Sequence, residues 1–361
     1  MMKKIMSLWK QSLKIWKKKG MPRNLIVLGC GIFVFTGILA SVLVVRRVWT
    51  MEKSVVEYPP AVLTVTHRHP LTGALLSEPL KILPQVFGVM VENAADAWPL
   101  SGIDEAFLVI EAPVEGNIPR FIAFFSEDQD VKKIGPVRSA RSYYLDWNAE
   151  FRGIYGHVGG SPDALANIAK GEALDLNQFF QDEYYYRDEL TRYAPHNVYT
   201  NTDLLKDSIS EIRKKYSVEA PVYDSWKFAD GASESANSDA THIAWGNGYD
   251  IDWTYEPTSN TYHRSQGGNT YTANNVVIIA TAIGMIPGDD KGRRTIRTIG
   301  EGKTTLLHNG ISTSGAWKKL SASDRIRFYD STGNEIVMNA GKTWIEVIDD
   351  LEKISTTSLR E

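Results

Sequence analysis

Residues 25–45 form an uncharged, strongly apolar segment of 21 residues, LIVLGCGIFVFTGILASVLVV. As an α-helix these residues span about 31 Å, which matches the apolar thickness of a bilayer, about 30 Å. Eight basic residues precede the segment and two follow it closely, so the positive-inside rule predicts a cytoplasmic N-terminus. The apolar core of a cleaved signal peptide has only roughly 7–15 residues. The segment therefore predicts a single-pass membrane protein whose remaining chain lies outside the cytoplasm.

The single cysteine, Cys30, lies inside this segment. It follows Val27-Leu28-Gly29, which is similar to the lipobox that precedes an acylated cysteine. A lipoprotein signal places its apolar run before the cysteine, but here five residues of the segment precede Cys30 and fifteen follow it. We therefore expect a transmembrane helix, and a lipid anchor stays open as the alternative. One cysteine also excludes an internal disulfide framework and a cysteine-ligated zinc site.

Charge is distributed unequally along the chain. Residues 1–47 hold ten basic residues and no acidic one, so the net charge of −3 leaves −13 on residues 48–361. An acidic exported part would repel phosphate backbones, so we expect no nucleic-acid partner. Within residues 1–24, apolar side chains recur at helical spacing among lysines, namely Ile5, Leu8, Trp9, Leu13 and Trp16. This pattern predicts a basic amphipathic segment on the inner leaflet, or simply a basic flank that sets topology.

The exported part has a mixed pattern that predicts an α+β or mixed α/β fold in two domains. Residues 46–69 contain Pro59-Pro60 and predict a tether. Residues 70–228 alternate short apolar runs with helical patterns, which predicts an α/β domain. Strands are expected near 87–91, 106–110, 120–125, 154–158 and 198–200. Helices are expected near 140–150 with Ser139 as N-cap, from Ser161-Pro162-Asp163 with Ser161 as N-cap and Pro162 as first residue, and from Thr202 to Tyr216.

A second domain is expected after a polar linker at residues 229–240, ADGASESANSDA. Residues 241–350 contain β-branched runs separated by turns, which predicts a small sheet or open barrel. Asn309-Gly310 between two such runs is a strong hairpin signal. Residues 351–361 predict a loose tail.

One group of residues is suited to binding an anion. Arg120, Arg138 and Arg141 are cations in or near predicted elements, and Gly159-Gly160-Ser161 leads from a strand into a helix. Free N–H groups at a helix start attract anions, and guanidinium groups bind carboxylate or phosphate. His157 and His196 are further candidates. The alternative is that Arg138 and Arg141 pair with neighbouring acids and that the glycines only make the turn.

Enzyme chemistry has weaker support in the sequence. Glu111, Glu115 and His157 are the candidate acid–base residues, although ion-paired or solvated carboxylates are the favoured explanation of the two glutamates. We find no H-E-x-x-H, no P-loop and no dinucleotide fingerprint. No residue spacing suggests a metal site, so we expect neither a metal nor a cofactor.

Several motifs together resemble one family. The chain contains, in order, Pro70-Leu71-Thr72-Gly73, Gly135-Pro136-Val137-Arg138-Ser139-Ala140-Arg141, His157-Val158-Gly159-Gly160-Ser161, Ala194-Pro195-His196-Asn197, Asp290-Lys291-Gly292-Arg293-Arg294 and Gly341-Lys342-Thr343-Trp344-Ile345. Over about residues 70–350 this resembles the YerB-like family of bacterial surface lipoproteins, whose domain is named only as one of unknown function. The resemblance implies an extracytoplasmic bacterial protein with an α/β half and a β-rich half. It implies no established activity, and it adds Ser139 and Asn197 to the binding candidates.

Three functional hypotheses follow. The first is a membrane-anchored cell-envelope protein that binds an anionic envelope ligand or a protein partner. The second is a cell-wall hydrolase or transferase with Glu/His acid–base chemistry. The third is a purely structural partner of the division or wall-synthesis machinery. The first two require the candidate side chains to converge.

Overall fold

The computed structural model describes residues 10–11, 14–15, 38–43, 45–46, 67–234 and 238–359. The chain divides into two compact units, Met1–Val65 and Thr66–Glu361. Residues 38–43 and 45 are helical, and the remainder of the predicted transmembrane segment lies outside the described residues, as do most of residues 1–24 and 46–69. Within the described ranges, no helix combines the length and the apolar character needed to cross a membrane.

The second unit is built around a ten-stranded sheet that contains strands from both halves of the sequence. Its strands, in spatial order, are β20 (Arg327–Asp330), β19 (Ile311–Lys319), β18 (Gly300–His308), β15 (Asn275–Ala280), β22 (Thr343–Ile348), β4 (Leu108–Pro113), β5 (Pro119–Ser126), β3 (Val86–Val91), β6 (Ile154–His157) and β7 (Leu174–Asn177). The two halves meet where β22 pairs with β4 in parallel.

Strand direction determines where the ends of these strands collect. β15, β22 and β4 are parallel neighbours, and so are β3, β6 and β7. β5 is antiparallel to both β4 and β3, so all six strands run the same way and their carboxyl ends share one edge. Ligands of open α/β sheets bind outside this edge.

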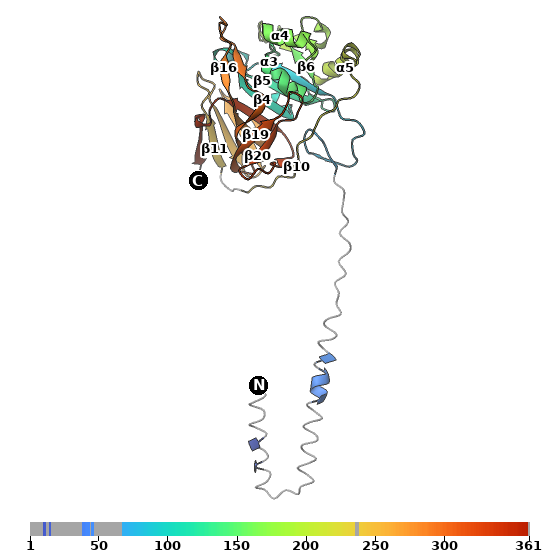
Figure 1. Ribbon diagram of the computed structural model, residues 1–361, viewed down its shortest axis with the longest axis vertical. Helices are drawn as coiled ribbons and strands as arrows, with labels where there is room; N and C mark the ends of the chain where they lie inside the picture. Colours follow the sequence, from blue (N-terminus) through green and yellow to red (C-terminus); the bar gives the residue numbers. More distant parts are fainter. Residues whose placement is uncertain are drawn as a thin grey trace. The chain divides into compact units, whose positions relative to one another are not determined.

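A second, five-stranded sheet and three helices cover the faces of the large sheet. The smaller sheet has the order β14 (Asn269–Ala273), β13 (Thr261–Gln266), β12 (Ile251–Glu256), β11 (Ser238–Ile243) and β23 (Ile354–Leu359). One apolar core contains the aromatic side chains of the smaller sheet together with apolar side chains of α5 (Thr202–Tyr216). The other core contains residues of α3 (Ser142–Ala149) and α4 (Pro162–Ala169). Figure 1 shows these helices together at one end of the unit.

Shorter elements complete the second unit. Two-stranded sheets pair β1 (His67–Arg68) with β2 (Leu75–Leu76), β8 (Tyr186–Arg187) with β9 (Val198–Tyr199), β10 (Phe228–Ala229) with β21 (Met338–Asn339), and β16 (Ile283–Met285) with β17 (Arg294–Ile296). Single 3₁₀ turns are η1 (Ala95–Ala97), η2 (Ile103–Glu105), η3 (Glu115–Asn117), η4 (Asp182–Tyr184) and η5 (Leu351–Lys353).

Local sequence signals explain many of these elements. The strands predicted near 87–91 and 120–125 are the fully buried β3 and β5, and the predicted hairpin forms with Asn309-Gly310 as its two-residue turn. Ser161 is the N-cap of α4 and Pro162 its first residue, as predicted. The prediction of Ser139 as the N-cap of α3 is wrong, because Ala140 bridges to Gly160 and keeps the chain extended as far as Arg141.

Strands of the second half are distributed differently from the expected small sheet or open barrel. β15, β18, β19, β20 and β22 extend the large sheet, β11–β14 and β23 form the five-stranded sheet, and β16 pairs with β17 in a separate two-stranded sheet. The expected loose tail contributes η5 and β23, because β23 pairs along β11 and covers its otherwise open edge. The domain boundaries at 228 and 241 stay a prediction.

A buried charged cluster joins the two sheets. Arg264 on β13 is fully buried, and its Nη2 donates to both carboxylate oxygens of Glu111 on β4, at 2.9 and 2.8 Å. Glu346 on β22 lies beside Glu111 in register and accepts a 3.0 Å hydrogen bond from Trp253 Nε1. The Arg264 guanidinium also lies 5.0 Å from the ring centroid of Trp344. One cation thus serves two buried carboxyl groups.

The protonation of this cluster follows from its burial. Removal from water raises the pKa of Glu346 well above its usual value, and the adjacent charge of Glu111 raises it further. Arg264 donates to Glu111, so we assign the negative charge to Glu111 and the proton to Glu346. A protonated Glu346 can donate a hydrogen bond to Glu111, which relieves the repulsion between two neighbouring carboxylates.

We predict that Glu346→Gln reduces the pH dependence of stability. The folded state holds the Glu346 proton more tightly than the unfolded chain does, because a glutamate side chain in an unfolded chain has a pKa of about 4.3. The stabilisation is therefore complete at acidic pH and is lost as pH rises through the folded pKa, at up to about 1.4 kcal/mol per pH unit. Glutamine keeps a donor at the same place without titrating. Urea unfolding from pH 5 to 9 should give a flatter pH profile for this variant, while the exposed control Glu352→Gln follows the wild type. Identical profiles for Glu346→Gln and wild type would contradict the assignment.

Candidate functional site

The shared carboxyl edge of the parallel strands gathers most of the predicted site residues. Glu92 follows β3, His157 ends β6 and Asn177 ends β7. The extended segment at residues 138–141 crosses this edge, because Arg138 N–H donates to Met90 O and Ala140 N–H to Gly159 O. The sequence motifs around Arg138 and His157 are therefore adjacent in space.

His157 is completely buried, and its ring links the end of β6 to Asp175 on β7, the last strand of the large sheet. Its Nδ1 lies 2.7 Å from the Gly159 carbonyl oxygen, and its Nε2 lies 2.8 Å from Asp175 Oδ1 on β7. Both partners are acceptors, so both hydrogen bonds form only when the imidazole carries a proton on each nitrogen. The ring thus holds Asp175 in place.

The glycine turn before α4 is already hydrogen-bonded within the protein. Gly159 N–H donates to Asn177 Oδ1 at 3.1 Å, and Ser161 N–H donates to Ala140 O at 3.1 Å. Gly159 has φ +57°, and a Cβ there would lie 2.7 Å from the Phe179 ring. Gly160 bridges to Ala140. The turn thus shapes its surroundings rather than leaving the Gly159 and Ser161 N–H groups free for an anion.

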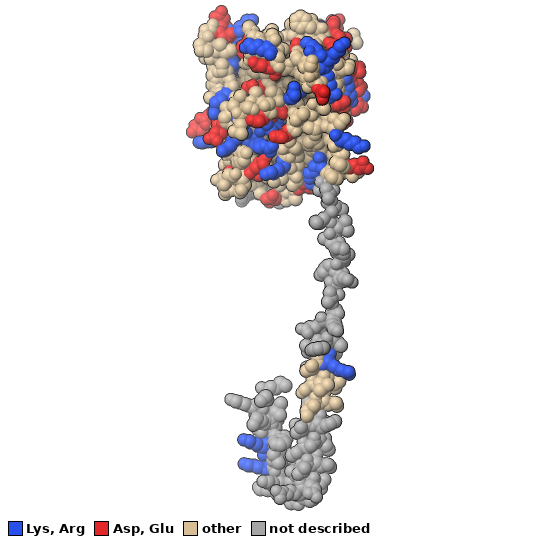
Figure 2. Space-filling model, turned by 45° about the vertical axis from the view of Figure 1, so that its right-hand side comes forward, with Lys and Arg blue, Asp and Glu red and all other residues tan. Residues whose placement is uncertain are grey.

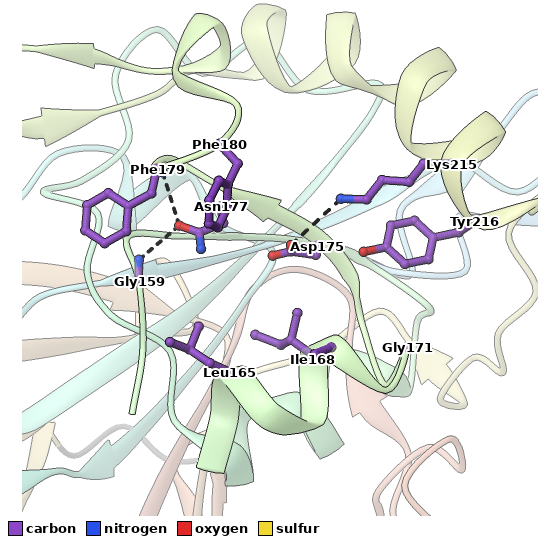
Figure 3. A pocket seen from close by; sticks show the side chains of 11 residues that line it. Gly159, Leu165, Ile168, Gly171, Asp175, Asn177, Phe179, Phe180, Lys215 and Tyr216 are labelled. Atoms are coloured by element: carbon purple, nitrogen blue, oxygen red, sulfur yellow. Dashed lines mark hydrogen bonds and ion pairs between the residues drawn. The ribbon is translucent and has the colours of Figure 1, made fainter. Parts of the chain in front are cut away.

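A cleft of about 630 Å³ opens beside β7, the last strand of the large sheet. Figure 3 shows Leu165 and Ile168 of α4 on one side and Lys215 and Tyr216 of α5 on the other, with the phenylalanine pair at one end. Lys215 Nζ lies 3.9 Å from Asp175 Oδ2. The residues that line the cleft are Gly159, Leu165, Ile168, Ala169, Gly171, Asp175, Asn177, Phe179, Phe180, Lys215 and Tyr216.

Two phenylalanines distinguish this cleft from an ordinary surface hollow. The exposed fractions of Phe179 and Phe180 are 64% and 80%, although both are large apolar residues. The Asn177 side chain fixes their loop, because its Oδ1 accepts hydrogen bonds from both Gly159 N–H and Phe179 N–H. Aromatic rings held beside polar groups at a concave surface are typical of a ligand site.

Arg138 and His196 belong to a separate ionic cluster. Glu92 is almost fully buried and binds both, with Oε1 at 2.9 Å from Arg138 Nε and Oε2 at 2.7 Å from His196 Nδ1. Asn197, also buried, accepts a 2.9 Å hydrogen bond from Arg187 Nη1. These contacts connect β3 with the loop that leads into β9.

The other two arginines lie near the turn between β4 and β5. Arg141 forms a bidentate pair with Glu115, with Nε–Oε1 and Nη2–Oε2 distances of 2.8 and 2.6 Å. Arg120 donates to Ser139 O at 2.9 Å, and in the described part of the chain no carboxylate is within ion-pair distance of it. Burial and the nearby charges of Arg141 and Arg138 lower the pKa of Arg120 to about 10.

The predicted acid–base residues share no hydrogen-bond partner. Glu111 is buried between the two sheets with Arg264, Glu115 is paired with Arg141, and His157 is paired with Asp175. Of the cleft lining, sequence reasoning named only Gly159 as a site residue. The missed residues include Asp175, Phe179, Phe180 and Lys215. The adjacent pair Phe179-Phe180 in a polar stretch was the available signal, since loops seldom expose two large aromatic side chains in succession.

Comparison with known proteins agrees with this architecture. The N-terminal and C-terminal domains of DUF3048, described as a protein of unknown function, match residues 71–217 and 241–345. The sheet arrangement is similar to the crystal structure of YerB from Bacillus subtilis, with a TM-score of 0.69, 28% identity, and coverage of 80% of this chain and 99% of that one.

The class defined by fold and sequence is thus a two-part α/β and β-rich protein of the DUF3048 type. "Putative lipoprotein YerB" of Bacillus subtilis (strain 168) is 31% identical over 297 residues, which cover 79% of this chain and 87% of the relative. The chain belongs to the DUF3048 family, in which YerB is a relative.

We predict that Glu92→Gln lowers the free energy of unfolding by about 2 kcal/mol, because the partly exposed Arg138 guanidinium and His196 imidazole lose their shared, buried carboxylate. Asp230→Asn serves as the control, since the Asp230–Arg68 pair is exposed and such pairs contribute about 0–1 kcal/mol. Chemical denaturation of both variants measures the difference. Equal losses would show that the Glu92 cluster does not hold the loop before β9.

Proposed function

We propose that this protein is a membrane-anchored, extracytoplasmic binding protein of the bacterial cell envelope, and that the cleft beside β7 takes its ligand. The observation that supports this most strongly is the exposed Phe179-Phe180 pair above the opposite charges of Asp175 and Lys215. Leaving two phenylalanine rings in water loses the stabilisation that burial would give, and a ligand that covers them recovers it. His157 and Asn177 hold the polar floor and the aromatic loop in position before any ligand arrives.

The chemistry of the cleft favours a muropeptide, a sugar pair that carries a short peptide. Aromatic rings contact the apolar faces of sugars, while a carboxylate and an ammonium group complement the amine and carboxylate of a peptide. Lys215 and Asp175 provide these two charges at one place. Figure 2 shows acidic and basic side chains intermixed over the face that it draws, so recognition depends on local charges more than on one large basic patch.

The cleft suits a ligand bound by side chains better than an added β-strand. The Gln181 side chain covers the outer edge of β7, because its Oε1 accepts from Asn177 N–H at 2.9 Å. This contact occupies a backbone group that strand addition would need.

We predict that Phe179→Ala/Phe180→Ala weakens muropeptide binding by about 5- to 150-fold, since two rings at about 0.5–1.5 kcal/mol each lose their contacts. Isothermal titration of the detergent-solubilised full chain with purified muropeptides measures this. Leu190→Ala is the matched control, because Leu190 is fully exposed and lies outside the cleft lining. Unchanged affinity in the double variant, or equal weakening in the control, would contradict the site.

The anchor is the second part of the proposal. Residues 25–45 match the length of a membrane span, and the charges around them favour a cytoplasmic N-terminus. The name of the YerB relative describes a lipoprotein, which makes acylation of Cys30 the competing anchor. A lipid anchor requires the Cys30 thiol, whereas a transmembrane helix does not.

We predict that Cys30→Ala stays in the membrane fraction at its full length, because alanine leaves all 21 residues of the uncharged segment available to span the bilayer. Cell fractionation, combined with metabolic labelling by a fatty-acid analogue, separates the alternatives. Labelling of the wild type that disappears in Cys30→Ala, together with loss of the variant from the membrane, would show a lipid anchor instead.

A further inference from the structure

A second, smaller cavity lies at the carboxyl ends of β4 and β22, away from the cleft. Its volume is about 150 Å³, and it is lined by Pro113 at the end of β4, by Val347 and Ile348 of β22, and by Trp245 and Arg294. Strand ends of this kind are the usual binding position in open α/β sheets. Elements from both halves of the sequence build it, since β4 and β22 are paired neighbours.

Two buried hydrogen-bond donors at this cavity have no partner. Trp245 is 92% buried, and its Nε1 finds no acceptor among the described residues. The Nε atom of Arg294 is also buried and also finds no acceptor among the described residues. Buried donors are normally paired, so two orphans at one cavity indicate a missing acceptor.

The charge of the lining favours a negatively charged acceptor. Lys353 Nζ pairs with Asp349 at 2.6 Å, so these two charges compensate each other. Arg294 has only a neutral side-chain partner, Asn117 Oδ1, which lies 2.6 Å from its Nη2. One positive charge therefore remains at the cavity, beside the apolar side chains of Ile283, Val347 and Ile348.

The sequence motif Asp290-Lys291-Gly292-Arg293-Arg294 brings this arginine to the cavity. Asp289 organises the turn between β16 and β17, because its carboxylate accepts hydrogen bonds from the N–H groups of Lys291 and Arg293 and pairs with the Arg293 side chain. The turn leads directly into β17, whose first residue is Arg294. The motif thus forms the turn that places Arg294 at the cavity.

We infer that this cavity binds a small monocarboxylate with a short apolar tail. The carboxylate accepts from Arg294 and Trp245, and the tail lies against Ile283 and Ile348. A volume of 150 Å³ corresponds to about five non-hydrogen atoms, at roughly 30 Å³ for each water in the liquid, and propionate has that number. The inference does not depend on the cleft or on its muropeptide ligand.

Propionate is the probe that tests this site, and propionamide is its uncharged isostere. The full chain in detergent should show a concentration-dependent rise in its unfolding midpoint with sodium propionate, beyond that of sodium chloride at equal ionic strength, and none with propionamide. Arg294→Gln should weaken propionate binding tenfold or more, and Trp245→Phe about threefold. Lys291→Gln, an exposed change in the same turn, should bind as the wild type does.

Other outcomes overturn the inference. Equal effects of propionate and propionamide would mean that the cavity does not select a negatively charged acceptor. Unchanged affinity in Arg294→Gln, with a folded variant shown by an unchanged unfolding midpoint without ligand, would place any propionate elsewhere. Phe179→Ala/Phe180→Ala should leave propionate binding intact, which separates this site from the cleft.

Discussion

The buried pairing of Arg264 with Glu111 and Glu346 is the constraint on which the second unit depends. Each residue comes from a different strand, and Glu111 and Glu346 meet where the two halves of the sequence form one continuous sheet. A buried arginine without its carboxylates would be strongly destabilising, so the smaller sheet has to pack over β4 and β22 in one register. Trp253 and Trp344 exclude water around the cluster, which strengthens its hydrogen bonds. This fixed junction in turn sets the common edge at which the strands end.

Because six strands end at this common edge, the polar residues that follow them lie close together, although they do not all line one site. Arg138 and Arg141, which look like anion ligands in the sequence, are neutralised by Glu92 and Glu115 and fasten loops to strand ends. The two proposed binding sites lie elsewhere along this edge. One is the cleft beside β7, where α4 and α5 flank the last strand, and the other is the small cavity at β4 and β22.

Sequence patterns predicted the local elements better than their assembly. Apolar runs identified β3 and β5, Ser161-Pro162 identified the start of α4, and Asn309-Gly310 identified a hairpin, because each depends on neighbouring residues alone. The partners of Arg138 and Arg141 are Glu92 and Glu115, 46 and 26 residues away, and no local pattern reveals such pairings. The same reason hid the role of Glu111, whose arginine is 153 residues distant. The cleft was missed because its walls come from α4, β7 and α5, and only Phe179-Phe180 gave a local signal.

Hydrogen exchange of the full chain in a lipid nanodisc, with and without saturating muropeptide, tests the central claim that the cleft is the ligand site. The account predicts slower amide exchange in residues 165–180 and 213–217, with unchanged rates in the smaller sheet at residues 251–273. Unchanged exchange in both cleft segments under saturating muropeptide, or protection confined to the smaller sheet, would contradict it.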